Sequence, residues 1–319
     1  MKSFFGKVKL KYTIGILALS AAVIALIWWQ FISLKPYQIS QTEIQDIYQR
    51  HAGYTPEILF EEIKPGQYTI SFTSYDGDKV EGRLELPEEV SLEQWLSEHN
   101  TGANEIFLGV SAMGRNYLRW WQDSFQGRPT ITQVNKIGEM ALASNNILVA
   151  IDARYHGTRK SETLPLSKIM NNLNLWGKRS DYENMVMGTI MDYKHLISAL
   201  EATFGKADIT LAGYSMGAQV SLILGATDKR INKILAIVPP NVDNKVAKVA
   251  PINFITMLDE RRVWLLTANG DDYADNSENL NLFANINSSN KKHLSFNSGH
   301  ILPEGYTDKL LPWFENEAQ

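Results

Sequence analysis

The pattern of hydrophobic and polar positions begins with an unbroken apolar run. No side chain from Thr13 to Leu34 is ionisable. A helix of that length, rising about 1.5 Å per residue, crosses the roughly 30 Å hydrocarbon core of a bilayer. A cleavable signal peptide is the alternative, but its apolar region is shorter and ends in small residues. Here Ala18-Leu19-Ser20 is followed by more apolar residues and by Trp28-Trp29, so we predict an uncleaved transmembrane signal-anchor over residues 13–34.

Charged residues flank this run unevenly. Four of the 31 basic residues precede it, and none of the 35 acidic residues does. The positive-inside rule therefore predicts a cytoplasmic N-terminus over residues 1–12 and an exported remainder. We expect a single-pass protein of a bacterial inner membrane, with its main domain on the periplasmic or extracellular side. The chain has a formal net charge of −4 and its exported part is more acidic still, which argues against nucleic acid as a partner.

A different pattern follows the apolar run. Residues 35–62 are polar with a short helical pattern, and we interpret them as a juxtamembrane stalk that packs onto the next domain, residues 63–319. Residues 68–75 and 79–86 alternate apolar and polar positions on either side of Asp76-Gly77-Asp78, which predicts an antiparallel hairpin.

The rest of the chain alternates continuous apolar runs with helical patterns. Such runs indicate parallel strands that are covered on both faces. The predicted strands are Glu105–Ser111, Ile147–Ala153, Asp208–Ala212, Lys233–Val238, Val263–Ala268 and His293–Phe296. The predicted helices are Thr130–Ala143, Asp181–Phe204, Ala218–Ala226, Ser277–Asn287 and Asp308–Glu317.

Composition excludes several kinds of chemistry. The chain has no cysteine, so disulfides, thiolate nucleophiles and cysteine metal sites are ruled out. No His, Asp and Glu cluster has metal-ligand spacing, and neither a phosphate loop nor a dinucleotide fingerprint occurs. We therefore expect no metal and no other cofactor.

A G-x-S-x-G motif, Gly213-Tyr-Ser215-Met-Gly217, stands where a predicted strand meets a predicted helix. A serine at the tip of such a sharp turn has a strained backbone and leaves no room for side chains two positions away, a clearance that the two glycines supply. The turn holds the hydroxyl near the N-terminus of the helix, where developing negative charge is favoured. We predict that Ser215 is a nucleophile, with a structural glycine-rich turn as the alternative.

A serine nucleophile needs a histidine base and an acid that orients it, in the chain order Ser, acid, His. His300 follows the last predicted strand and is the candidate base. His293 starts the same strand, about 20 Å away at roughly 3.3 Å per residue, so both cannot reach Ser215. The acid should follow the strand Val263–Ala268, where Asp271 and Asp272 are both candidates.

These features together resemble the α/β-hydrolase superfamily over about residues 65–315: the hairpin, the six further strands, the elbow at Ser215, and Ser298-Gly299-His300. The Asp152-Ala-Arg-Tyr-His-Gly157 turn resembles the dienelactone-hydrolase-like and carboxylesterase-like branches. The resemblance implies a mostly parallel twisted sheet of about eight strands with helices on both faces, preceded here by the transmembrane helix.

The same resemblance implies roles for individual residues. Asp-x-Tyr-Ala-Asp is similar to the family's spacing around the acid, which favours Asp271 and leaves Asp272 as the alternative. The family's oxyanion hole uses two backbone amides. Here they would be the amide of Met216 and that of Ala112 or Met113, in a loop where this chain has Ser111-Ala112 and the family often has His-Gly.

We therefore expect a membrane-anchored serine hydrolase that cleaves small-molecule carboxylic esters through an acyl-enzyme. A peptidase or amidase of the same fold, and a catalytically silent envelope binding protein, are the alternatives. The segment Thr158–Arg179 is the candidate for a small lid, which favours small or medium acyl groups. Arg154 and His156 are expected to brace their turn, and Trp120-Trp121 to pack or to line an acyl pocket.

Overall fold

The structure is a computed structural model that describes residues 2–51, 53–99 and 104–315, with side chains from Tyr12 onward. The strands of the main sheet are β1 (Leu59–Lys64), β2 (Gln67–Thr73), β3 (Lys79–Glu85), β4 (Asn104–Val110), β7 (Ile147–Ile151), β8 (Ala207–Tyr214), β9 (Ile231–Ile237), β10 (Arg262–Ala268) and β11 (Lys291–Phe296). A separate hairpin joins β5 (Ser124–Phe125) to β6 (Arg128–Pro129).

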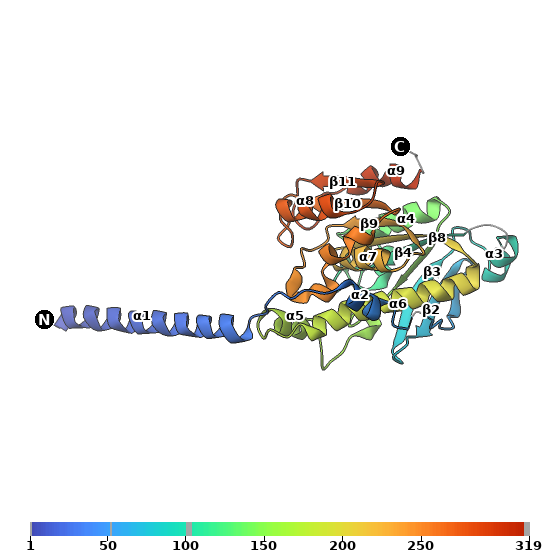
Figure 1. The fold of residues 1–319 in the computed structure, drawn as a ribbon. Helices are drawn as coiled ribbons and strands as arrows, with labels where there is room; N and C mark the ends of the chain where they lie inside the picture. Colours follow the sequence, from blue (N-terminus) through green and yellow to red (C-terminus); the bar gives the residue numbers. More distant parts are fainter. Residues whose placement is uncertain (1, 52, 100–103, 316–319) are drawn as a thin grey trace.

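The described part of the chain forms a nine-stranded sheet in the order β1-β2-β3-β7-β4-β8-β9-β10-β11 (Figure 1). Strands β1, β2, β3 and β7 pair antiparallel, and β7, β4, β8, β9, β10 and β11 pair parallel. The predicted hairpin and all six further strands are confirmed. The sheet has one strand more than expected, because β1 begins at Leu59, inside the range predicted as the stalk.

Helices cover both faces of the sheet. They are α2 (Gln41–Tyr48), α3 (Leu92–Glu98), α4 (Val134–Ala143), α5 (Leu166–Asn174), α6 (Ser180–Phe204), α7 (Met216–Thr227), α8 (Asn276–Asn285) and α9 (Leu311–Phe314). Short 3-10 turns are η2 (Tyr117–Trp120), η3 (Gly157–Arg159), η4 (Asn244–Val249), η5 (Pro251–Asn253), η6 (Ile255–Met257) and η7 (Tyr306–Leu310). The predicted helix Asp308–Glu317 is instead η7 followed by the short α9, and residues 316 and 317 lie outside the described residues.

Each parallel strand is buried on both faces because its alternate side chains enter different cores. In β7, Ile147, Val149 and Ile151 join the core beneath α6 and α7, whereas Leu148 and Ala150 join the core beneath α4 and the C-terminal segment. This pleat explains why the parallel strands appear in the sequence as continuous apolar runs rather than as alternating patterns.

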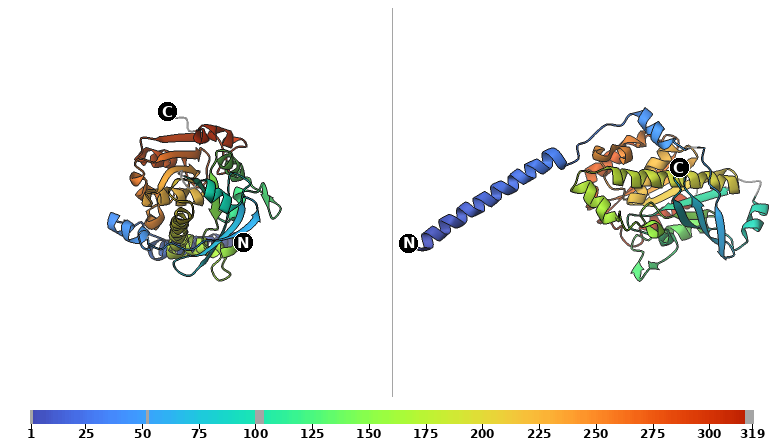
Figure 2. Two further views of the ribbon diagram at one scale, coloured as in Figure 1. Left: turned by 90° about the vertical axis from the view of Figure 1, so that its right-hand side faces the viewer. Right: turned by 90° about the horizontal axis from the view of Figure 1, so that it is seen from below.

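The N-terminal helix α1 (Lys2–Ile27) continues into a π-helical turn, η1 (Trp28–Ile32). Residues Tyr12–Ile32 are long and apolar enough to cross a membrane, with a mean hydropathy of 2.1, and none of their most apolar stretch is buried against the protein. Figure 2 shows α1 projecting from the domain as a single rod. The helix coincides with the predicted span, and a signal sequence near the N-terminus would look the same.

The segment after the helix packs against the domain. The Tyr37 amide donates a hydrogen bond to the carbonyl oxygen of Asn244 (2.9 Å), and the hydroxyl of Tyr48 donates one to Lys248 O (2.7 Å). Ile44 and Tyr48 are buried in the core, and the Lys194 ammonium donates a hydrogen bond to Tyr48 O at 2.8 Å. Residues 37–48 are therefore an integral layer of the domain.

Candidate active site

Ser215 occupies the strained turn between β8 and α7. Its backbone has φ 57° and ψ −119°, a left-handed conformation that non-glycine residues rarely adopt, and its amide donates a hydrogen bond to Ile237 O (2.9 Å). A methyl group at Gly213 would overlap the carbonyl of Gly217, and one at Gly217 would overlap the carbonyl of Val110. Both glycines are thus required by close backbone contacts, as the motif predicts.

The hydroxyl of Ser215 faces the imidazole of His300. Ser215 Oγ lies 2.8 Å from His300 Nε2, and His300 Nδ1 lies 2.8 Å from Asp271 Oδ2 and 3.0 Å from Asp271 Oδ1. The Asp271 side chain is 1% exposed and that of His300 is 17% exposed, so the carboxylate is shielded while the imidazole remains accessible. The three side chains come from the carboxyl ends of β8, β10 and β11 and form one continuous chain of contacts.

The two candidate acids differ clearly in position. The Asp271 carboxylate contacts His300 and also accepts a hydrogen bond from the Tyr273 amide (2.8 Å), whereas Asp272 is exposed. Asp275 caps α8 by accepting a hydrogen bond from Glu278 N (2.8 Å). Of the aspartates in this loop, the structure therefore brings Asp271 to the imidazole.

Tyr214 fixes the loop that carries the base, a role that the sequence did not reveal. Its hydroxyl donates a hydrogen bond to His300 O (2.8 Å) and accepts one from Leu302 N (3.0 Å). Burial raises the pKa of Tyr214 to about 12, so the hydroxyl remains a donor across the ordinary pH range. The residue beside the nucleophile thus ties the elbow to the histidine loop.

The loop after β4 lies against the first turn of α7. Gly217 approaches the carbonyl oxygens of Val110 and Ser111 so closely that no side chain would fit between them. Met216 is the first residue of α7, and the first amides of a helix have no acceptor within it. Ala112 and Met113 follow directly in the apposed loop and are half-buried. The predicted oxyanion candidates therefore lie on two segments that contact each other where Gly217 meets Val110.

Asp152 braces this loop from the neighbouring turn. Its fully buried carboxylate accepts hydrogen bonds from Tyr117 N (3.0 Å) and from Thr158 N (2.8 Å), and burial raises its pKa. Gly157 has φ 52° and packs so tightly on the carboxylate that a methyl group would overlap it. Asp152 of the Asp-x-Arg-x-His-Gly motif therefore joins the loops after β4 and β7. The sequence alone does not reveal this role of Asp152.

The remaining motif residues are structural, as predicted. Arg154 pairs with Asp76 and, at 2.9 Å, with Asp192, and His156 is fully buried with Nδ1 2.7 Å from Arg154 O. Burial lowers the pKa of His156. Trp120 is also fully buried, and its ring covers the backbone of Gly109, so it packs rather than lining a pocket.

His293 contacts neither Ser215 nor Asp271 in the described structure. Its Nε2 is 2.8 Å from Thr267 Oγ1, and its ring stacks on Phe283 with centroids 5.0 Å apart. Among the residues that the structure describes, no group of three or more His, Asp or Glu side chains is arranged to hold a metal ion.

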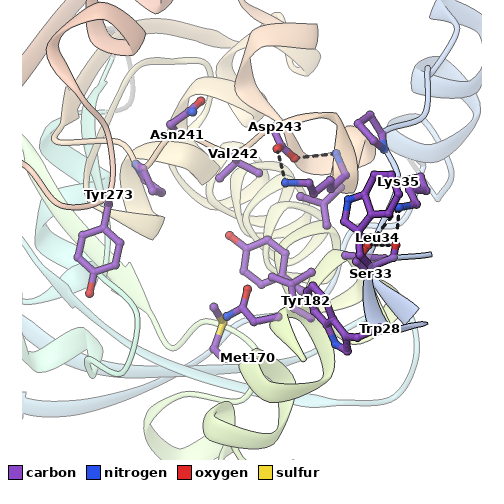
Figure 3. A pocket seen from close by; sticks show the side chains of 17 residues that line it. Trp28, Ser33, Leu34, Lys35, Met170, Tyr182, Asn241, Val242, Asp243 and Tyr273 are labelled. Atoms are coloured by element: carbon purple, nitrogen blue, oxygen red, sulfur yellow. Dashed lines mark hydrogen bonds and ion pairs between the residues drawn. The ribbon is translucent and has the colours of Figure 1, made fainter. Parts of the chain in front are cut away.

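A cavity of about 770 Å³ lies next to Tyr273, and its lining does not include Ser215, Asp271 or His300 themselves (Figure 3). Its walls come from η1 and the following residues 33–36, from α5, from the start of α6, and from the loops after β9 and β10. Tyr273, on the last of these loops, borders the cavity, and its ring lies 4.6 Å from that of His300. In Figure 3, Tyr273 and Lys35 lie on opposite sides of the cavity, with Tyr182 between them.

Comparison with solved structures gives several esterases of the same architecture. Acetyl xylan esterase 1 from Thermoanaerobacterium sp. JW/SL YS485 matches with a TM-score of 0.63 and 14% identity, over 88% of this chain and 95% of its own. The acetyl xylan esterase from Paenibacillus sp. R4 matches with a TM-score of 0.59 and 12% identity, over 91% and 98% of the two chains. The chain has the α/β-hydrolase fold.

A cold-adapted esterase from an Arctic intertidal metagenomic library shares the α/β-hydrolase fold as well, with a TM-score of 0.54 and 16% identity over 79% of this chain and 96% of its own. No protein-family model matches the sequence, and no curated protein matches it. The likeness to these esterases therefore lies in the fold. Support for a chemical reaction comes from the arrangement of Ser215, His300 and Asp271.

Proposed function

We propose that this protein is a serine hydrolase that cleaves carboxylic esters. The observation that carries the proposal is the contact chain in which Ser215 Oγ is 2.8 Å from His300 Nε2 and His300 Nδ1 is 2.8 Å from Asp271. These are hydrogen-bonding distances between a nucleophile, a base and an orienting acid. The esterase folds described above support the same chemistry.

In the proposed reaction, Ser215 Oγ attacks the ester carbonyl carbon while His300 Nε2 accepts the hydroxyl proton. Asp271 holds the imidazole through Nδ1 and stabilises its cationic form. The tetrahedral intermediate collapses as His300 returns the proton to the departing alkoxide, which leaves an acyl group on Ser215. Water, deprotonated by His300, then attacks the acyl carbonyl, and the carboxylic acid and the free serine are released.

The negative oxygen of each tetrahedral intermediate is proposed to accept hydrogen bonds from two backbone amides. One is that of Met216, whose position at the start of α7 also favours negative charge through the helix dipole. The other is that of Ala112 or Met113 in the loop against which Gly217 packs. Removing one such donor from an oxyanion hole typically costs about 10²–10³ in kcat.

The proposal includes a location. The apolar helix Tyr12–Ile32 would be an uncleaved anchor in a bacterial inner membrane, with four lysines on its cytoplasmic side and the hydrolase domain on the periplasmic or extracellular side. A reporter fused after Gln319 that is active only outside the cytoplasm tests this orientation. An inactive fusion of this kind, together with an active fusion of a cytoplasm-only reporter at the same residue, would overturn it.

The deciding experiment is labelling with a fluorophosphonate, which reacts with activated serines. We expect the full-length protein to label and the Ser215→Ala and His300→Ala variants not to label, with kcat on p-nitrophenyl acetate lowered by about 10⁶. Ser298→Ala is the matched control, because Ser298 lies in the His300 loop and its hydroxyl bonds only Gly299 O (3.1 Å). Absence of labelling in the wild type would favour a silent binding protein.

A second assay separates ester from amide hydrolysis. Wild-type protein is offered p-nitrophenyl esters and peptide anilides at matched concentrations. We expect turnover of the esters only. Faster cleavage of the anilides would establish the peptidase or amidase alternative instead.

A further inference from the structure

We propose that the cavity beside the catalytic triad binds the hydrocarbon chain of an amphiphilic ester, so that the substrates are long-chain esters taken from the membrane. This inference rests on the function proposed above and concerns the chemical class of the substrate. The segment Thr158–Arg179 alone favours small or medium acyl groups, because it is short. The cavity is larger than the space that this segment alone would enclose. The end of the apolar helix and the residues that follow it form one of its walls.

The walls of the cavity combine an apolar part with three charged side chains, Lys35, Asp243 and Lys245, of which the last two pair with each other at 3.1 Å. Trp28 and Leu34 contribute to the apolar part from the end of the N-terminal helix, Met170 and Leu173 from α5, and Val242 from the loop after β9. A volume of about 770 Å³ lies within the range of sites that enclose small organic ligands. The apolar part of the wall favours a flexible hydrocarbon chain, whose burial there removes apolar surface from water.

One side chain, that of Tyr273, connects this cavity to the triad. The Tyr273 ring borders the cavity and packs against the ring of His300 with centroids 4.6 Å apart. Tyr182 also borders the cavity, and its hydroxyl donates a hydrogen bond to the side-chain oxygen of Gln219 (2.9 Å) on α7. The side-chain amide of Gln219 donates in turn to Val249 O (2.7 Å), so this contact supports the cavity wall. A chain lying in the cavity would reach the triad past the ring of Tyr273.

Hydrogen bonds hold the two sides of the cavity together. Trp28 Nε1 donates to Leu175 O (2.7 Å) just after α5, and an Arg179 guanidinium nitrogen donates to Lys35 O (3.1 Å). Gly177 packs so closely on Ile32 O that a side chain would not fit there. The cavity is thus a built feature and not a loose gap between a helix and a domain.

The cavity lies beside an apolar surface. Trp29, Phe31, Leu175 and Trp176 are 59%, 80%, 52% and 60% exposed and surround the point where the N-terminal helix joins the domain. Exposed aromatic and aliphatic side chains in one place are typical of surfaces that meet a membrane. Their position at the end of the apolar helix argues that the chain enters from the bilayer.

Chain-length preference tests the cavity in the full-length protein, reconstituted in phosphatidylcholine vesicles. We expect kcat/KM to rise from p-nitrophenyl acetate to p-nitrophenyl decanoate by up to about fourfold per added methylene, the gain from burying each one. Met170→Trp fills the cavity and should lower the decanoate-to-acetate ratio of kcat/KM at least about tenfold. Met170→Ala enlarges the cavity and should move the preference to longer chains.

Leu280→Trp is the matched control, because Leu280 is 49% exposed on α8 and does not border the cavity. It should keep the decanoate-to-acetate ratio within about twofold of the wild type. An unchanged ratio in both Met170 variants would overturn the inference. If a short-chain fluorophosphonate still labels Ser215 in that case, the proposed hydrolase function stands; if the wild type neither labels nor hydrolyses any ester, the proposed function itself has failed.

A second arm distinguishes a substrate dissolved in the membrane from one in water. A long-chain 4-methylumbelliferyl ester is placed either in the vesicles that contain the protein or in separate protein-free vesicles. We expect rapid hydrolysis only in the first arrangement. Equal rates in both would show uptake from solution and overturn delivery from the bilayer.

Discussion

The hydroxyl of Tyr214 donates a hydrogen bond to the carbonyl oxygen of His300, 2.8 Å away. The same hydroxyl accepts a hydrogen bond from Leu302 N at 3.0 Å, so a single side chain next to the nucleophile restrains both sides of the base. The spacing between Ser215 and His300 therefore depends on a contact that lies outside the triad.

Replacing Tyr214 tests this positioning role. Tyr214→Phe should lower kcat for p-nitrophenyl acetate about tenfold with little change in KM, because the imidazole loses its alignment rather than its chemistry. Tyr306→Phe is the control, since its buried hydroxyl bonds Thr132 O (2.7 Å) away from the site. Both variants should lose about 1 kcal/mol of stability. Equal kcat values in the two variants would show that Tyr214 is merely structural.

The two neighbouring aspartates give a second test. Asp271→Asn should reduce kcat by about 10⁴, because an amide cannot stabilise the imidazolium and favours the wrong tautomer. Asp272→Asn should stay within about threefold of the wild type, since its side chain is exposed and the structure shows the other carboxylate at His300. Steady-state kinetics on both variants decides the acid, and a larger loss in Asp272→Asn would refute the assignment.

Gly157 offers a test of the brace around Asp152. Gly157→Ala should lower the free energy of unfolding by about 2–4 kcal/mol and also lower kcat, because the methyl group would displace the buried carboxylate that bonds Tyr117 N. Gly77→Ala is matched, since Gly77 has φ 86° but open space around it, and should cost only about 1–2 kcal/mol. Urea unfolding, with activity measured in parallel, compares the two variants. Similar losses of stability and kcat in both would exclude the overlap with the Asp152 carboxylate as the cause.

Buried tyrosines predict a loss of stability at high pH. Burial raises the pKa of Tyr182 and of Tyr214 from 10.0 to about 12, so between those values the unfolded chain binds fewer protons than the folded protein. Their stabilising contribution is complete below pH 10 and disappears as the pH rises toward 12, by on the order of 2 kcal/mol for each. Urea unfolding between pH 9 and 12 measures the slope, and Tyr182→Phe should make it shallower.

The parts of the fold that could be predicted are those determined locally. The elbow at Ser215 follows from two glycines, and the six strands follow from apolar runs. Strand β1 was missed because Leu59–Lys64 is an exposed edge strand, stabilised mainly by its ladder with β2, and carries no burial pattern. In the sequence, the family resemblance alone favours Asp271 over Asp272, because adjacent residues share their local signals and only the loop's path decides which one meets His300.

The cavity could not have been predicted, because its walls come from segments far apart in the sequence. Trp28, Met170 and Val242 belong to three different parts of the chain and meet only in the folded protein. The same holds for the hydroxyl of Tyr214, whose partner is 86 residues away.

The hydrogen bond from Trp28 to Leu175 and the close contact between Gly177 and Ile32 have a mechanical consequence. A hydrolase on a flexible tether would sweep a volume above its membrane and meet soluble compounds as readily as lipids. With the proposed anchoring, these contacts would hold the apolar helix and the domain together and keep Ser215 at a constant height above the bilayer.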